Sequence, residues 1–180
     1  MPTGLLVVKC ANGPTLASDG ANLAAVFATL AHIREDTRAL DEAIAAAFGG
    51  AELVIRAPAN TASFGMTSPE FPGRIFEQIE LSDGTLRFLG VAGALLGYRL
   101  PAFIALNEPE ASLHPSLLDP LGRLIAKAAE RTQVWVVTHS EPLAAAIERH
   151  GAARPRLVSK LAGATEIAGM RFGAFEDGEA

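Results

Sequence analysis

Hydrophobic residues in the second half of the chain follow a pattern that predicts strands alternating with helices. Residues 102–106 form a continuous apolar run, as expected of a parallel strand covered on both faces. Apolar residues at three- and four-residue spacing then predict a helix over residues 116–131. A second apolar run at residues 133–137 precedes a helix at residues 141–150. Apolar strands that alternate with helices imply right-handed crossovers and a parallel sheet.

The first half of the chain is less regular. Residues 57–73 contain three prolines and two glycines, so we expect this stretch to be a connection between strands. Asp36 or Thr37 is a candidate cap for a helix that Gly49 and Gly50 end. The remaining periodicity predicts helices over residues 22–32, 37–48 and 82–98, and strands over residues 5–8, 53–56, 75–81, 156–160 and 166–172.

Length and composition place this pattern in a globular α/β protein. A chain of 180 residues is the size of one domain, and 49% apolar with 19% charged residues excludes a disordered chain. We therefore expect residues 1–180 to form a single α/β domain with a mostly parallel sheet flanked by helices on both faces. Residues 51–81 and 156–172 are expected to add antiparallel strands.

Net charge and cysteine content indicate which cellular compartment and which binding partners to expect. The net charge of −5 argues against nonspecific nucleic-acid binding by the whole surface. DNA stays open as a partner, but no basic stretch interleaved with aromatic residues indicates it. The single cysteine, Cys10, excludes a disulfide framework and suits the reducing cytoplasm. No apolar run approaches the ~18 residues of a membrane span, so we expect no membrane association.

Polar residues follow both predicted parallel strands. Asn107, Glu108 and Glu110 come after the first strand, and His139 lies directly after the second, between Thr138 and Ser140. Ligands gather at the carboxyl ends of strands in open parallel sheets. These two strand ends are therefore the first place to expect a binding or catalytic site.

The start of the helix at Ser82 is a third candidate. Ser82 can cap the helix, and Gly84 lets a ligand approach the backbone closely. The free N–H groups and the positive end of a helix bind phosphate well. Asp83 opposes an anion at this point unless its side chain points away. We expect this helix start and the two strand ends to face one common site.

Three strings in this order resemble a known family. The strings "LSDGTLRFL", "FIALNEPEASLHP" and "VWVVTHS" resemble the C-terminal half of the ABC-type ATPase superfamily, in particular the AAA-type ATPases related to RecF and SMC proteins. "LSDGT" is similar to the signature motif and "IALNEPE" to the Walker B strand with its catalytic glutamate. "EASLHP" is similar to the D-loop, and "THS" to the switch histidine. The resemblance covers about residues 15–170, including "SDGANLAAVFATL".

The resemblance implies roles for individual residues. Glu108 would orient or activate the attacking water, and His139 would hydrogen-bond the γ-phosphate of ATP. The signature residues would contact a nucleotide held by a partner subunit, and the D-loop residues would lie across a dimer interface. The partner implied is a second copy or a P-loop-bearing chain, with ATP and Mg²⁺ as cofactors. The implied nucleotide-binding residues are Ser82, Asp83, Gly84 and His139, and the interface residues are Ala111, Ser112, Leu113 and His114.

The sequence departs from the family at two points. Asn107 occupies the position of the metal-binding acid, so Mg²⁺ would be held through water or by Glu108. No G-x-x-x-x-G-K-[ST] string occurs in the 180 residues, although that loop cradles the phosphates of the nucleotide. We therefore expect a C-terminal portion of an ATPase, inactive or very weak without a P-loop from missing sequence or a partner.

Other interpretations of the same residues remain. The chain is alternatively a non-catalytic module that keeps the fold and dimerises, or binds a partner, through the surfaces around Ser82 and Leu113. Glu110 is interpreted as an ordinary solvated turn residue, and Ser82 as no more than a helix cap. A metal site built from Glu108, His114 and His139 is a further alternative.

Overall fold

The structure is a computed structural model, and it describes most of the chain. Part of the sequence prediction falls outside the described residues: Cys10 does, and so does the strand expected at residues 5–8, apart from Val8. The described residues are 8–9, 15–17, 20–34, 37–58, 61–151, 153–161 and 164–168.

Helices and strands alternate in the second half of the chain as the hydrophobic pattern predicts. The helices are α1 (Leu23–Thr29), α2 (Arg38–Ala47), α3 (Asp83–Leu96), α4 (Leu118–Ala129) and α5 (Glu141–His150), with short turns η1 (Leu30–Arg34), η2 (Gln78–Glu80) and η3 (Pro115–Leu117). The strands are β1 (Val8–Lys9), β2 (Leu53–Arg56), β3 (Thr61–Thr67), β4 (Ile75–Glu77), β5 (Phe103–Asn107), β6 (Gln133–Val137), β7 (Val158–Leu161) and β8 (Ala164–Ile167). None of these helices has the length and apolar character needed to cross a lipid bilayer.

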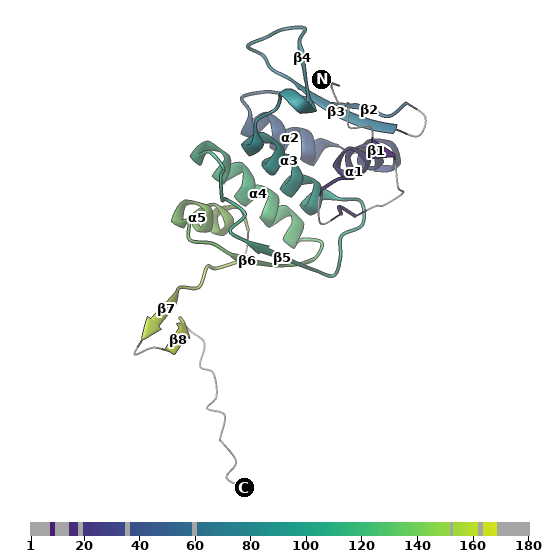
Figure 1. Cartoon of the computed structure of the whole chain (residues 1–180). Helices are drawn as coiled ribbons and strands as arrows, with labels where there is room; N and C mark the ends of the chain where they lie inside the picture. Colours follow the sequence, from purple (N-terminus) through teal and green to yellow (C-terminus); the bar gives the residue numbers. More distant parts are fainter. Residues whose placement is uncertain are drawn as a thin grey trace, which may run out of the picture.

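The strands form one parallel pair and two antiparallel groups. β5 and β6 pair in parallel, with Ala105 opposite Trp135. β3 lies between β1 and β2 and also pairs with β4, all antiparallel. β7 and β8 form an antiparallel hairpin that extends away from the other elements (Figure 1). The α/β class, the parallel crossover and the antiparallel strands expected within residues 51–81 are confirmed. A closing antiparallel pair is also present, but residues 169–172 of its expected second strand lie outside the described residues.

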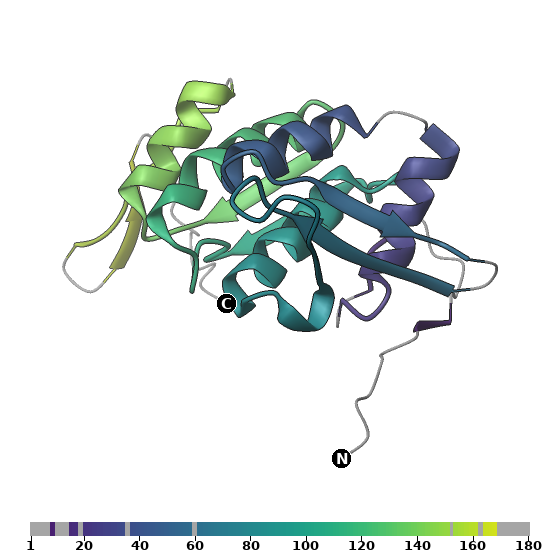
Figure 2. The same ribbon diagram turned by 90° about the horizontal axis from the view of Figure 1, so that it is seen from above.

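Helices α1 to α4 lie between the antiparallel sheet of β1–β4 and the β5–β6 pair (Figure 1). Figure 2 shows the antiparallel sheet lying over the helices. Phe27 of α1 meets Phe64 of β3 edge to face, with ring centroids 5.5 Å apart. Phe48 and Phe88 form a second such pair at 5.4 Å. The first contact joins the antiparallel sheet to α1, and the second joins the end of α2 to α3 within the helical layer.

The prediction that residues 57–73 form only a connection is wrong. This stretch contains β3, the central strand of the antiparallel sheet. Its prolines lie outside the strand, and Ala62, Phe64 and Met66 alternate toward the core. Gly65 lets β4 approach, because a Cβ there would lie 2.6 Å from the carbonyl oxygen of Phe76. The strand predicted over residues 75–81 ends at Glu77 and continues as η2.

The prediction that the parallel strands are covered on both faces is also wrong. Ile104, Leu106, Val134 and Val136 pack against the core. The opposite face, which we call the outer face of β5–β6, carries Phe103, Trp135 and Val137, and Trp135 is 54% exposed. Strands in parallel sheets are normally buried on both faces. Periodicity cannot reveal this exposure, because the apolar runs are continuous and do not mark which face is covered.

Helices α4 and α5 pack so closely that a side chain at position 122 has no room. A Cβ on Gly122 would lie 2.5 Å from the Cβ of Ala146 and 2.9 Å from its carbonyl carbon. Asp119 at the start of α4 accepts hydrogen bonds from Arg149 at 2.5 Å, and its carboxylate lies 3.0 Å from His150 Nε2. The lack of a side chain at Gly122 lets α5 approach α4 closely. The polar contacts of Asp119 then hold α5 in place.

Gly90 in α3 and Gly122 in α4 give a matched test of this packing. Gly122→Ala is expected to destabilise the fold by about 1–3 kcal/mol, because α5 must move away from α4. Gly90→Ala, where a Cβ meets open space, is expected to stabilise it by about 0.5–1 kcal/mol. Urea unfolding followed by circular dichroism measures both changes. Equal effects at the two positions would contradict the close α4–α5 contact.

Candidate functional site

The ends of β5 and β6 bring Glu108 and His139 together. The parallel register places Asn107 opposite Val137, and the N–H of Glu108 donates to the carbonyl of Val137 at 2.8 Å. The Nε2 atom of His139 lies 3.4 Å from Oε1 of Glu108. The His139 side chain is 84% exposed, and Glu108 is about half exposed. A carboxylate and an imidazole therefore stand side by side at the strand ends, open to solvent.

The backbone around Glu108 turns sharply. Glu108 has φ +46°, a left-handed conformation that is uncommon for a residue with a side chain. Its carbonyl accepts the N–H of Ala111 at 3.0 Å, and Pro109 behind it is buried. Such conformations cost of order 1–3 kcal/mol and cluster at functional sites. The turn aims the Glu108 side chain back across the end of β6, toward His139.

Glu110 connects the turn after β5 to the turn after β6. Its Oε1 accepts hydrogen bonds from the hydroxyl of Thr138 and, at 3.3 Å, from the N–H of His139. Thr138 Oγ1 also accepts the N–H of Ser140 at 2.9 Å. The Oε2 atom of Glu110 is buried and has no hydrogen-bond partner among the described residues. The interpretation of Glu110 as a solvated turn residue is therefore wrong.

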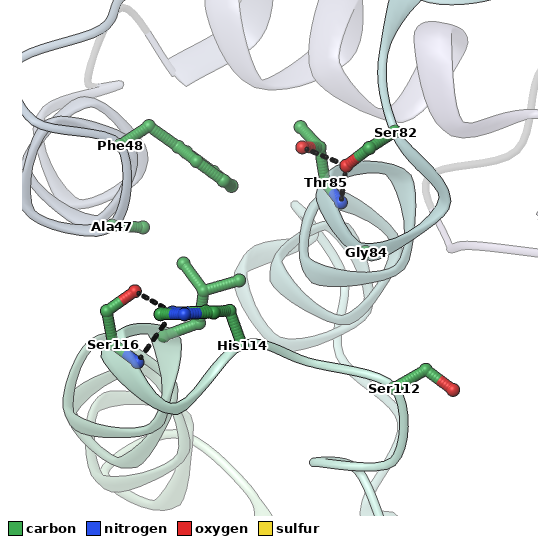
Figure 3. Close-up of a pocket in the computed structure, with 9 residues that line it drawn as sticks. Ala47, Phe48, Ser82, Gly84, Thr85, Ser112, His114 and Ser116 are labelled. Atoms are coloured by element: carbon green, nitrogen blue, oxygen red, sulfur yellow. Dashed lines mark hydrogen bonds between the residues drawn. The ribbon is translucent and has the colours of Figure 1, made fainter.

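A cavity of about 360 Å³ adjoins the start of α3 (Figure 3). Ser82 caps α3: its Oγ accepts the N–H of Thr85 at 3.1 Å and lies 2.9 Å from the hydroxyl oxygen of Thr85. The cap role is thus present, and the same hydroxyl also faces the cavity. Asp83 is exposed in the first turn of α3, where its negative charge interacts favourably with the positive end of the helix dipole. The cavity is lined by Ala47, Phe48, Ser82, Gly84, Thr85, Ser112, His114, Ser116 and Leu117.

The segment 111–114 contacts both this cavity and the turn after β5. Ser112 and His114 line the cavity, and a Cβ on Gly84 would lie 3.3 Å from the carbonyl oxygen of Ser112. Leu113 donates its N–H to the carbonyl of Glu110 at 2.9 Å. Glu108 and His139 are not among the lining residues. The structure thus has two polar sites, the Ser82 cavity and the Glu108–His139 pair, where the sequence led us to expect one.

The imidazole of His114 has a local structural role. Its Nδ1 accepts the N–H of Ser116 at 3.3 Å and so caps η3, and it lies 2.9 Å from the Ser116 hydroxyl oxygen. Within the described ranges, no group of three histidine, cysteine or acidic side chains is arranged to hold a metal. The alternative metal site of Glu108, His114 and His139 is therefore not formed. Asn107, exposed at the end of β5, adds only an amide oxygen.

The turn before Ser82 is held by a network of charges. Glu80 accepts the N–H of Glu77 at 2.9 Å and a bond from Arg74 at 2.7 Å. The backbone N–H of Glu77, and then the guanidinium of Arg74, lower the pKa of the Glu80 carboxyl. Arg74 also lies over the ring of Phe76, 4.4 Å from its centroid. These contacts fix the path of the chain into α3.

Comparison with known proteins identifies the fold. A family model described as "AAA domain, putative AbiEii toxin, Type IV TA system" matches residues 30–146. A comparison with curated protein sequences found no match. A structure described under ATP-driven dimerization and DNA-stimulated activation of SMC ATPases is 15% identical, with a TM-score of 0.55, over 73% of this chain and 80% of that one.

Two further solved structures agree with this fold. The SMC head domain from Thermotoga maritima is 20% identical, with a TM-score of 0.53, over 79% of this chain. An SMC head bound to the C-winged helix domain of ScpA is 14% identical, with a TM-score of 0.53, over 87% of this chain. The matched region spans 51% and 50% of those two chains. The fold is therefore that of an SMC-like ATPase head, the α/β fold of P-loop NTPases.

Removing Arg74 is expected to raise the pKa of Glu80 partway toward its ordinary value, because the bond from Glu77 remains. Since the folded-state pKa is lowered, this contact stabilises the fold above the unfolded-state pKa, and the contribution is lost as pH falls through the folded-state value. NMR titration of the Glu80 carboxyl in Arg74→Ala measures the change. Arg56→Ala, which removes a neighbouring ion pair to Glu77, is the control and should leave Glu80 unchanged. An unaltered titration in Arg74→Ala would contradict the contact.

Proposed function

The chain belongs to this AAA-domain family, and on that premise we propose that it is the signature, Walker B and switch-histidine portion of an ATP-hydrolysing domain. The observation that carries the proposal is the pairing of Glu108 with His139, 3.4 Å apart at the ends of two parallel strands. Phosphoryl transfer requires a positioned water and stabilised phosphate charge more than covalent chemistry. A carboxylate beside an imidazole at an open strand end supplies both.

Glu108 would accept a hydrogen bond from the attacking water and orient it toward the γ-phosphorus. The water oxygen then forms a bond to phosphorus while the bond to the β–γ bridging oxygen breaks, which yields ADP and inorganic phosphate. His139 would donate a hydrogen bond from Nε2 to a γ-phosphate oxygen and so stabilise its charge. The His139 side chain is 84% exposed, so a phosphate that other residues hold could reach it.

The Ser82 cavity would serve a second nucleotide contact. Ser82 and Gly84 offer a hydroxyl and backbone N–H groups at the positive end of a 14-residue helix. Glu108 and His139 do not line this cavity. Separate locations are what a dimer with shared nucleotides requires, since each copy then contributes its signature residues to the nucleotide of the other copy. Residues 111–114 would lie at that interface.

We further propose that hydrolysis requires a P-loop from elsewhere in the protein or from a partner chain. No P-loop string occurs in the 180 residues. The outer face of β5–β6 supports the proposal, since parallel strands are normally buried on both faces and this face carries Phe103, Trp135 and Val137. An α/β segment that covers this face would also reach the strand ends where Glu108 and His139 lie.

Magnesium has no site of its own among these residues. Mg²⁺ prefers carboxylate ligands in octahedral geometry, whereas Asn107 supplies an amide and Glu108 a single carboxylate. The described residues therefore do not fit a resident metal ion. Mg²⁺ enters the proposal only as the ion that the phosphates of ATP carry with them.

The second candidate function is a non-catalytic module that dimerises or binds a partner. Asn107 favours it, because an amide replaces the usual metal-binding acid. Light scattering with and without Mg-ATP separates the two functions. Dimerisation that depends on Mg-ATP supports the ATPase, and assembly that ignores nucleotide supports the module.

Glu108→Gln tests the ATPase in a preparation that carries a P-loop, in the same chain or in a partner. Turnover is expected to fall about 10²- to 10⁴-fold, because the amide no longer activates water. Glu141→Gln is the matched control, since Glu141 is an exposed glutamate at the start of α5 and its loss should leave turnover unchanged. Unaltered ATP hydrolysis in Glu108→Gln would remove Glu108 from its role, and micromolar binding with turnover by the isolated chain would refute the need for a P-loop.

Trp135 reports on the outer face, because it is the single tryptophan of the chain. In the isolated chain its fluorescence should be red-shifted and readily quenched by acrylamide, as its 54% exposure implies. In the P-loop-containing assembly the emission should shift to the blue and quenching should fall. Equal quenching in both preparations would mean that the outer face stays uncovered, against the proposal.

A further inference from the structure

Glu110 is hydrogen-bonded both to the turn that carries His139 and to segment 111–114, which lines the Ser82 cavity. Its carboxylate reaches the turn after β6, where it accepts from the Thr138 hydroxyl and the His139 N–H. Its own carbonyl accepts the N–H of Leu113, within the segment that lines the Ser82 cavity. One residue is thus bonded on one side to the backbone of His139 and on the other to segment 111–114.

The bonds made by the carboxylate act on the backbone that carries His139. The N–H of His139 donates to Glu110 directly, and Ser140 donates to the same Thr138 oxygen that donates to Glu110. A shift of this turn therefore changes the acceptor geometry at Glu110. Segment 111–114 begins at the next residue, and Ser112 is held there with φ +65°. A strained conformation of this kind persists only where the surrounding structure enforces it, so a shift of Glu110 would disturb the turn at Ser112.

The hydrogen bonding of the Glu110 carboxylate is compatible with a turn that changes position. Oε1 carries both hydrogen bonds, while Oε2 is buried without a partner among the described residues. A purely structural carboxylate would be expected to use both oxygens, because an unpaired buried acceptor destabilises the fold. The spare oxygen gives the donors at residues 138–139 an alternative acceptor when the turn shifts.

We infer that Glu110 is a positioning residue that couples the His139 turn to segment 111–114. The inference rests on the proposed function for its meaning: a phosphate sensed at His139 would alter the surface that faces the Ser82 cavity and the partner subunit. Glu110 itself touches neither phosphate nor water in this role. It transmits position through one side-chain acceptor and one main-chain acceptor.

The test follows backbone amides by ¹⁵N–¹H NMR in the full chain, without nucleotide. Thr138→Val removes the hydroxyl with little change of shape, and it should shift the amide signals of Ala111, Ser112 and Leu113. In a Glu110→Ala or Glu110→Met background, the same substitution should no longer shift them. Glu110→Met keeps the length of the side chain without an acceptor, so the test survives if the alanine variant does not fold. Glu110→Gln keeps the acceptor and should restore the shifts.

Thr132→Val is the matched control at the opposite end of the parallel pair. Thr132 donates to the carbonyl of Pro101, so its loss disturbs β5–β6 without involving Glu110. It should leave the amides of residues 111–113 unchanged. Shifts that persist in Glu110→Met, shifts that Glu110→Gln fails to restore, or equal shifts from Thr132→Val would each overturn the coupling. Because no nucleotide is present, these outcomes are independent of whether Glu108 hydrolyses ATP.

Discussion

The parallel pairing of β5 with β6 is the constraint on which the candidate site depends. It fixes Asn107 opposite Val137, so the residues that follow each strand must emerge at the same edge. The bond from Glu108 to the carbonyl of Val137 continues the pairing one residue past the strand. The approach of His139 to Glu108 at this edge follows from that register. A slip of one residue would turn Glu108 to the other face.

The second half of the fold was predictable from the sequence, and so were α1, α2 and β2 of the first half, whereas β3 was not. Continuous apolar runs and helical periodicity located β5, β6, α4 and α5 because each signal is long and unbroken. β3 was missed because its small residues, such as Gly65, match a loop in composition. Only tertiary pairing explains that glycine, since β4 lies too close for a side chain. Close packing against Phe76, eleven residues further along the chain, outweighed strand propensity at Gly65.

The candidate site was likewise predicted only in part. Glu108 and His139 were predicted together because both follow apolar strands of one sheet, and the structure places them side by side. Ser82 was expected at the same site, yet it faces a separate cavity. A pattern in the chain does not give the distance between a helix start and a strand end. Glu110 was missed because a lone turn glutamate carries no signal, although Thr138 at the end of the adjacent strand was a cue.

The two described strands of the parallel pair carry a consequence for handling the protein. Each has an edge with no described neighbouring strand, next to the apolar outer face. Free strand edges are templates on which other chains add strands. Expressed alone, the chain should therefore be colloidally unstable at high concentration. The practical remedy is co-expression with the segment or partner that covers that edge, or storage at low concentration with a mild detergent.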